Sequence, residues 1–224
     1  MSYQTHFEKH DNHIVVDINT GKALIDTGSP ATIGRTPFPF AGRDFPCMQE
    51  FMGVSLDAIS AEIGMHIDWL VGADVLGKYQ IEIDWLSQTL TVHEEPLGAG
   101  VGEPLRFVMG IPVISIMMNG KRVAMFFDTG AKISYAKQAL IDTIPVSGSA
   151  HDFYPGFGSF ETPIRQVPTS LAGADVMLTV GQLPDMLEAT LLAAGVSGIV
   201  GNDIFTTYSK VNVDYLGRRF LVTR

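Results

Sequence analysis

The chain has 224 residues and a net charge of −9; 46% of its residues are hydrophobic and 17% are charged. This composition is typical of a globular protein and excludes a disordered chain. The negative charge argues against nucleic acid and anionic membranes as partners, because both require a basic surface.

The chain contains a single cysteine, Cys47. One cysteine excludes an intramolecular disulfide and favours a reducing compartment. The N-terminal residues contain no apolar segment of the kind that a signal peptide carries, and no apolar run is long enough to span a membrane. We therefore expect a cytoplasmic protein. No catalytic histidine motif surrounds Cys47, so we interpret it as a small packing residue.

The first half of the chain, residues 1–93, is predicted to consist of short strands and turns. Ser55 is a suitable N-cap for a helix, and Gly64 is a suitable stop signal after it. The Pro- and Phe-rich segment before this helix is predicted to be irregular. The predicted strands are 4–7, 13–18, 23–25 and 69–71, followed by a hairpin at 80–92; the predicted helix is 55–62, and the irregular segment is 36–42.

Residues 94–103 contain three glycines, Gly98, Gly100 and Gly102. Their spacing differs from G-x-G-x-x-G and no helical pattern follows, so a phosphate-binding loop is excluded. The composition is that of a linker. We predict that this linker separates an N-terminal lobe from a C-terminal lobe.

The second half, residues 104–224, repeats the organisation of the first. Asn119-Gly120 is a strong hairpin signal between two apolar runs. A helix is predicted between Pro184 and Gly195. The predicted strands are 105–108, 113–118, 121–127, 163–167 and 176–180, with a final hairpin at 211–222. The chain is therefore predicted to be all-β with a few short helices.

An Asp-Thr-Gly motif follows an apolar run in each half, at 26–28 and at 128–130. A single such match in a chain of this composition has about a one-in-ten chance, so two matches with the same lead-in are unlikely to be coincidental. An apolar-apolar-Gly motif follows each of them, at 70–72 and at 199–201. Two anchors in the same order define an internal repeat of about a hundred residues.

The two motifs suggest a specific chemistry. An aspartate at the end of a buried strand carries a desolvation cost unless it is hydrogen-bonded or functional. Glycine two positions later allows the backbone to approach the carboxylate closely. If a pseudo-two-fold axis brings both loops together, the carboxyls share a proton, so that one activates a water while the other polarises a carbonyl.

The paired motifs resemble those of the retropepsin and pepsin families of aspartic proteases. Each half resembles a retropepsin-type subunit, and the whole chain resembles a single-chain, pepsin-like arrangement of two β-barrel-like lobes. The Gly-x-Asp-apolar continuation at 72–75 and at 201–204 is more similar to retropepsins and their bacterial relatives than to pepsins. The resemblance extends over nearly the whole chain.

The resemblance implies that Asp26 and Asp128 form the catalytic pair, without a metal or other cofactor. Ser29 would hydrogen-bond the outer oxygen of Asp26. Ala131 has no hydroxyl to do the same for Asp128, so we expect inequivalent carboxyls and a mild rather than strongly acidic pH optimum. The residues implied to support the pair are Thr27, Gly28, Ser29, Thr129, Gly130 and Ala131, with the two threonines interlocking the loops.

The two halves differ in the segment between their motifs, because residues 129–200 are more numerous than residues 27–71. The first lobe is therefore expected to be too short for a full flap. An aromatic, glycine-containing turn in the second lobe is either a flap tip over the substrate or an ordinary surface hairpin. The flap reading assigns substrate binding to Tyr154, Gly156 and Phe157.

Histidines and acids near the N-terminus allow two interpretations. His6, His10 and His13 lie close to Glu8 and Asp11, a set that includes metal-ligand types. No second cluster of ligands is visible in the sequence. We therefore favour a solvated hairpin over a metal site.

Other singled-out residues are interpreted as structural. Asp74 and Asp203 are expected to cap the short helical turns that follow them or to bond an arginine. Trp69 and Trp85 are expected in the core. Four phenylalanines are expected to pack over the first lobe rather than to line a cleft: Phe38, Phe40, Phe45 and Phe51.

The sequence thus predicts an aspartic endopeptidase that cleaves a peptide or protein substrate between apolar residues. It would act as a monomer or a homodimer, with no nucleic acid or membrane partner. The alternative is a catalytically weak or inactive module that binds peptides or proteins on the same fold.

Overall fold

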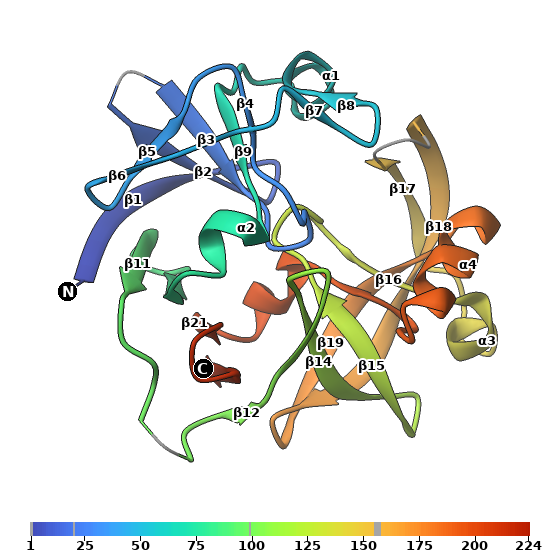
Figure 1. Ribbon diagram of the computed structural model, residues 1–224. Helices are drawn as coiled ribbons and strands as arrows, with labels where there is room; N and C mark the ends of the chain where they lie inside the picture. Colours follow the sequence, from blue (N-terminus) through green and yellow to red (C-terminus); the bar gives the residue numbers. More distant parts are fainter. Residues whose placement is uncertain (1, 20, 99, 155–157) are drawn as a thin grey trace.

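The computed structural model describes residues 2–19, 21–98, 100–154 and 158–224 (Figure 1). Strands dominate it and the helices are short, which confirms the predicted all-β class. In the first half the elements are β1 (Ser2–His10), β2 (His13–Ile18), β3 (Gly21–Ile25), β4 (Ile33–Gly34), β5 (Phe38–Phe40), β6 (Arg43–Phe45), β7 (Glu50–Phe51), β8 (Val54–Ser55), α1 (Leu56–Ile63), β9 (Trp69–Val71), α2 (Ala73–Leu76), β10 (Gln80–Asp84) and β11 (Thr89–His93).

The second half contains a corresponding series with a longer middle section. Its elements are β12 (Glu103–Pro104), β13 (Arg106–Val108), β14 (Ile111–Met118), β15 (Lys121–Phe127), β16 (Ser134–Ala136), α3 (Gln138–Ile141), β17 (Gly148–Tyr154), β18 (Gly158–Leu171), β19 (Ala174–Gln182), α4 (Asp185–Ala193), β20 (Gly198–Val200), the 3-10 helix η1 (Asn202–Thr206), β21 (Lys210–Asp214) and β22 (Arg219–Thr223).

A ten-stranded sheet runs across both halves in the order β12-β22-β21-β10-β11-β1-β2-β3-β9-β4. Within this sheet the repeat-equivalent strands β10 and β21 pair antiparallel, with Glu82 opposite Asn212. Antiparallel pairing of equivalent strands is the arrangement that a two-fold axis between the repeats produces. The predicted division into two lobes, residues 1–93 and 104–224, with a linker at 94–103, stays a prediction. The ten-stranded sheet contains strands from both predicted lobes and so does not separate them.

The second sheet belongs to the second half and has the order β13-β14-β15-β20-β16-β19-β18-β17. In each half the strand before the Asp-Thr-Gly motif pairs in parallel with the strand before the downstream glycine: β3 with β9, and β15 with β20. Both aspartates therefore leave the end of a strand that is buried between neighbours. The hairpin β17–β18 projects from this half on the side of the molecule that faces α1, β7 and β8 (Figure 1).

Several local predictions are confirmed and two are corrected. Ser55 caps α1 by accepting a hydrogen bond from the Ala58 amide at 3.4 Å, and Gly64 ends the helix at a φ of 67°. The segment predicted to be irregular instead forms the β5–β6 hairpin, because Phe38 and Phe40 point into the core. Trp85 is only partly buried and stacks on Phe205 with 4.4 Å between ring centroids.

Asp74 and Asp203 lie inside their helical turns and not at the N-cap position, although Oδ1 of Asp74 accepts from the Val75 amide at 2.9 Å. Among the described residues, neither aspartate forms an ion pair with an arginine. The Thr32 hydroxyl donates to Asp74 at 2.6 Å and accepts from the Gly72 amide at 3.0 Å. In the second half, the Ser134 hydroxyl donates to Asp203 at 2.7 Å and accepts from the Gly201 amide. Each aspartate thus ties its helical turn to the strand after the Asp-Thr-Gly loop. Burial raises the pKa of Asp203 to about 7.

Candidate active site

The two Asp-Thr-Gly loops meet through a reciprocal set of hydrogen bonds between Thr27 and Thr129. Each backbone amide donates to the other residue's hydroxyl at 3.0 Å. The Thr27 hydroxyl donates to the Phe127 carbonyl at 2.9 Å, and the Thr129 hydroxyl donates to the Ile25 carbonyl at 2.7 Å. Both threonines are fully buried. The symmetric pattern gives the two loops a fixed relative position beneath the carboxyls.

The loops are close enough for each glycine to lie against the opposite carboxyl. A β-carbon on Gly28 would lie 2.1 Å from Cγ of Asp128, and a β-carbon on Gly130 would lie 2.6 Å from Cγ of Asp26. Only a residue without a side chain fits at either position. Asp26 and Asp128 share a hydrogen bond, so the structure brings the two sequence-predicted carboxyls into direct contact.

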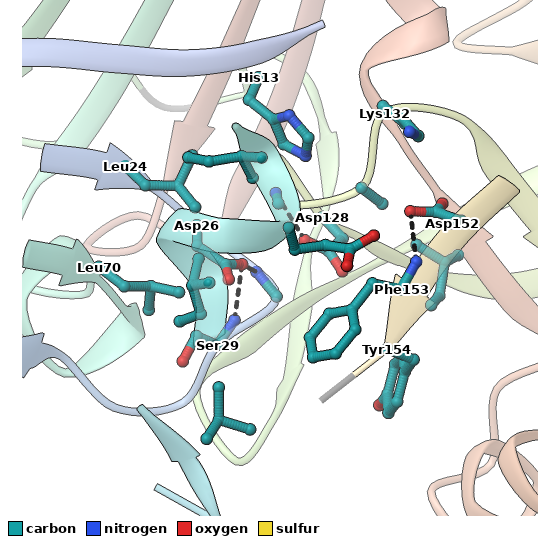
Figure 2. A pocket seen from close by; sticks show the side chains of 18 of the residues that line it. His13, Leu24, Asp26, Ser29, Leu70, Asp128, Lys132, Asp152, Phe153 and Tyr154 are labelled. Atoms are coloured by element: carbon teal, nitrogen blue, oxygen red, sulfur yellow. Dashed lines mark hydrogen bonds between the residues drawn. The ribbon is translucent and has the colours of Figure 1, made fainter. Parts of the chain in front are cut away.

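The loops present backbone donors to the carboxyls, but they do so unequally (Figure 2). Oδ1 of Asp26 accepts from the amides of Gly28 and Ser29, both at 2.9 Å. Oδ1 of Asp128 accepts from the Gly130 amide at 2.8 Å. The predicted bond from the Ser29 hydroxyl to Asp26 is wrong, because that hydroxyl donates to the Ala31 carbonyl at 2.8 Å. The carboxyls remain inequivalent through the extra amide on Asp26.

Both carboxyls have a raised pKa. Burial is the largest cause for Asp26, followed by the charge of Asp128 and the hydrogen bond between them, and together they raise its pKa well above the ordinary value. Burial also raises the pKa of Asp128, while the hydrogen bond from Asp26 and the Gly130 amide oppose this rise. Two carboxyls in contact titrate as a pair and retain one proton between them over a range of pH.

This retained proton predicts how stability depends on pH. Above the ordinary aspartate pKa of about 3.9, the unfolded chain releases protons that the folded pair still holds. The stability contributed by the pair is therefore fully present below that pH and is lost as the pH rises through the raised pKa. We expect Asp26→Asn to gain stability relative to the parent protein from about pH 4 to pH 7.

Urea unfolding curves at several pH values check this expectation. Asp203 is present in both proteins, so its own raised pKa cancels in the difference. A difference in unfolding free energy that stays constant with pH would show that the pair does not retain a proton in the folded state.

A cavity of about 200 Å³ opens beside the two carboxyls. Apolar side chains from both halves make up most of its walls. The first half contributes Leu24, Ile33, Phe51, Val54, Ile59, Ile63 and Leu70, and the second half contributes Tyr135, Phe160, Leu183, Leu187 and Ile199. Phe51 thus lines the cavity, against expectation, whereas Phe38, Phe40 and Phe45 are buried in the core as predicted.

The β17–β18 hairpin of the second half forms one wall of this cavity. Phe153 and Tyr154 lie in that wall, and Figure 2 shows both beside the two aspartates. Burial, with added repulsion from Asp128 and Asp26, raises the pKa of Tyr154. The predicted flap residues Gly156 and Phe157 lie outside the described residues. In the facing half, the shorter β7–β8 hairpin adds Phe51 and Val54 to the wall.

A hydrogen bond joins the long hairpin to the opposite half of the cavity. The Ser159 hydroxyl on β18 donates to Glu62 on α1 at 3.3 Å. This bond links the hairpin of the second half to α1 of the first half.

His13 is part of the cavity wall, a position that no sequence pattern predicted for it. The prediction of a solvated hairpin is wrong for His13, which is 7% exposed. The turn before it is inserted against the second half: the Asn12 side chain donates to the Lys132 carbonyl at 2.5 Å, and Lys132 pairs with Asp11 at 3.1 Å. Burial lowers the pKa of His13. Within the described part of the chain, no cluster of three or more metal-ligand side chains occurs.

Two more cavity residues, Tyr135 and Asp152, were also missed. The Tyr135 hydroxyl donates a hydrogen bond to Asp152 on the long hairpin. Cys47 is partly buried with its thiol facing the Phe45 carbonyl, which fits a packing residue. None of the helices in the described ranges is long and apolar enough to cross a membrane.

Comparison with known proteins gives matches only among solved structures. No family model and no curated protein matches the chain. The solution structure of simian foamy virus (mac) protease matches with 13% identity and a TM-score of 0.32, covering 42% of this chain and 91% of that chain. EIAV protease complexed with the inhibitor HBY-793 matches with 20% identity and a TM-score of 0.33, covering 43% of this chain and 86% of that chain. Both of these solved structures are retroviral proteases, and each aligns with less than half of this chain.

Proposed function

We propose that the protein is an aspartic endopeptidase that hydrolyses peptide bonds with a water activated by Asp26 and Asp128. The observation that carries this proposal is the contact between two partly buried carboxyls, each accepting hydrogen bonds from the amides of its own loop and packed on the opposite glycine. Such an arrangement costs desolvation energy that a purely structural role does not require. The apolar walls of the adjoining cavity fit apolar substrate side chains.

The two carboxyls take different roles because they share one proton, so that one is charged while the other is protonated. The charged carboxyl accepts a proton from the water as the water oxygen bonds to the carbonyl carbon, while the protonated carboxyl donates its proton to the carbonyl oxygen. Breaking the C–N bond of this tetrahedral species requires a proton on the leaving nitrogen, and the carboxyl that took a proton from water supplies it. A hydroxyl of the tetrahedral species returns a proton to the other carboxyl, which restores the pair.

A single copy of the chain provides both carboxyls, so the proposed cleft needs no residue from a second copy. Monomeric and homodimeric forms both fit this requirement. The single cysteine supports a reducing compartment such as the cytoplasm. The proposed partner is a peptide or protein substrate.

Digestion of an unfolded, alkylated protein substrate from mildly acidic to neutral pH tests the proposal. We expect new peptide termini by mass spectrometry, with an alkaline limit of kcat/KM above the ordinary pKa range of an aspartate because the pair's pKa is raised. Added hydroxylamine should yield no hydroxamate, since water attacks without an acyl-enzyme. Equal inertness of the parent protein and the Asp26→Asn variant at every pH would overturn the proposal and favour a binding module.

A further inference from the structure

The internal repeat allows the two walls of the cavity to be compared position by position. In the first half, Ile33 on β4 lies opposite Leu70 on β9. In the second half, Tyr135 on β16 lies opposite Ile199 on β20. All four side chains line the cavity. The repeat therefore places a phenol in the second half where the first half has an aliphatic side chain.

The phenol of Tyr135 holds a carboxylate in the cavity wall. Its hydroxyl donates to Oδ2 of Asp152 on β17, and the Phe153 amide donates to Oδ1 at 2.9 Å. Burial and the charge of Asp152 raise the pKa of Tyr135, so the phenol keeps its proton and acts as the donor. A carboxylate offers about four acceptor positions, so these two bonds leave one free position on each oxygen.

The charges around Asp152 do not neutralise it. In the described ranges, no lysine, arginine or histidine nitrogen lies within 4.0 Å of its carboxylate. Lys132 lies near Asp152 in Figure 2, but its ammonium pairs with Asp11 at 3.1 Å. Burial lowers the pKa of His13, whose Nδ1–H donates to the His10 carbonyl at 3.2 Å, so its ring is neutral near pH 7.

We propose that Asp152 determines substrate specificity by binding a basic side chain, so that the substrate carries lysine or arginine on one side of the scissile bond and an apolar residue on the other. This inference rests on the proposed peptidase function. A substrate side chain beside Leu70 and Ile33 meets a mainly aliphatic wall, whose carboxylate at its edge, Glu62, already accepts from the Ser159 hydroxyl. A substrate side chain beside Ile199 reaches the anchored carboxylate of Asp152. A free acceptor position on each oxygen suits the fork of an arginine guanidinium best.

Binding measurements test the proposed subsite separately from catalysis. Two peptides that differ only in arginine or norleucine next to the central bond are titrated, by fluorescence anisotropy, into the Asp26→Asn variant. We expect the arginine peptide to bind about 10-fold more tightly, the size of one charge-assisted hydrogen bond, and the addition of Asp152→Asn to remove that advantage. Asp142→Asn makes the same charge change at the exposed C-cap residue after α3 and should leave the advantage intact.

Cleavage then distinguishes failure of this inference from failure of the proposed function. The parent protein should cleave a randomised peptide library with a basic residue enriched at one position flanking the bond, and Asp152→Lys should shift that enrichment to acidic residues. Cleavage without basic enrichment, or equal binding of both peptides, overturns the role of Asp152. Absence of cleavage together with preserved arginine preference overturns the peptidase function alone.

Discussion

Replacing either Asp26 or Asp128 by asparagine is expected to lower kcat/KM by about 10³-fold or more, the scale of a lost general acid or base. The physical reason is that the pair works with one shared proton and one negative charge. An amide at either position can neither accept the proton of water nor pass one to the leaving nitrogen. Rates on one peptide, measured across the active pH range, give the ratio directly.

The two single variants and their combination also test whether the carboxyls act as a unit. Groups that share one catalytic step are strongly non-additive, so the double variant should be about as inactive as either single variant. Asp17→Asn is a matched control, because Asp17 is an exposed residue of β2 that does not line the cavity, and it should keep the parent rate. A single variant that retains most of the activity would show that the two carboxyls do not act together.

The Asp-Thr-Gly motifs predicted the contacts of the two central loops because each motif determines its own local backbone structure and because the motif occurs twice. From a buried strand that ends in Asp-Thr-Gly, the backbone turn, the amides next to the carboxyl and the small residue that allows close approach can all be predicted. None of these features depends on residues elsewhere in the chain. The capping of α1 by Ser55 and the turn at Asn119-Gly120 follow the same logic, and both glycine-containing ends adopt the left-handed backbone that their residues allow.

The residues that the sequence did not reveal depend on contacts between distant segments. His13 is buried because the turn before it meets the loop that follows Asp128, more than a hundred residues later. Asp152 and Tyr135 meet because β17 and β16 lie on the same cavity wall, although β17 and β16 are not neighbours in the sheet. No pattern of spacing or composition encodes such encounters.

Ser29 shows how a correct motif can still give a wrong contact. The Ser29 hydroxyl could donate to the Asp26 carboxyl or to the carbonyl two residues ahead, and in the structure it donates to the Ala31 carbonyl. Short polar side chains often bond their local backbone in turns. The amide of Ser29 takes the place that the hydroxyl was expected to fill.

Loss of the threonine hydroxyls should cost more stability than any other small change near the site. Thr129→Val keeps the shape of the side chain but leaves the Thr27 amide without its acceptor and the Ile25 carbonyl without its donor. Both groups are buried, and an unsatisfied buried polar group costs about 1–3 kcal/mol. We expect an unfolding free energy lower by about 2–4 kcal/mol in urea titrations, and Thr27→Val should behave alike by symmetry.

Serine replacements separate the hydrogen bonds from the packing of the methyl group. Thr129→Ser retains the hydroxyl, so it should lose less than half of what Thr129→Val loses, and it should keep the activity. Thr129→Val should lower kcat/KM as well as stability, because the loops no longer hold the two carboxyls in contact and a small displacement of reacting groups is costly. Equal losses for serine and valine would mean that methyl packing, not the reciprocal hydrogen bonds, holds the Asp26 and Asp128 loops together.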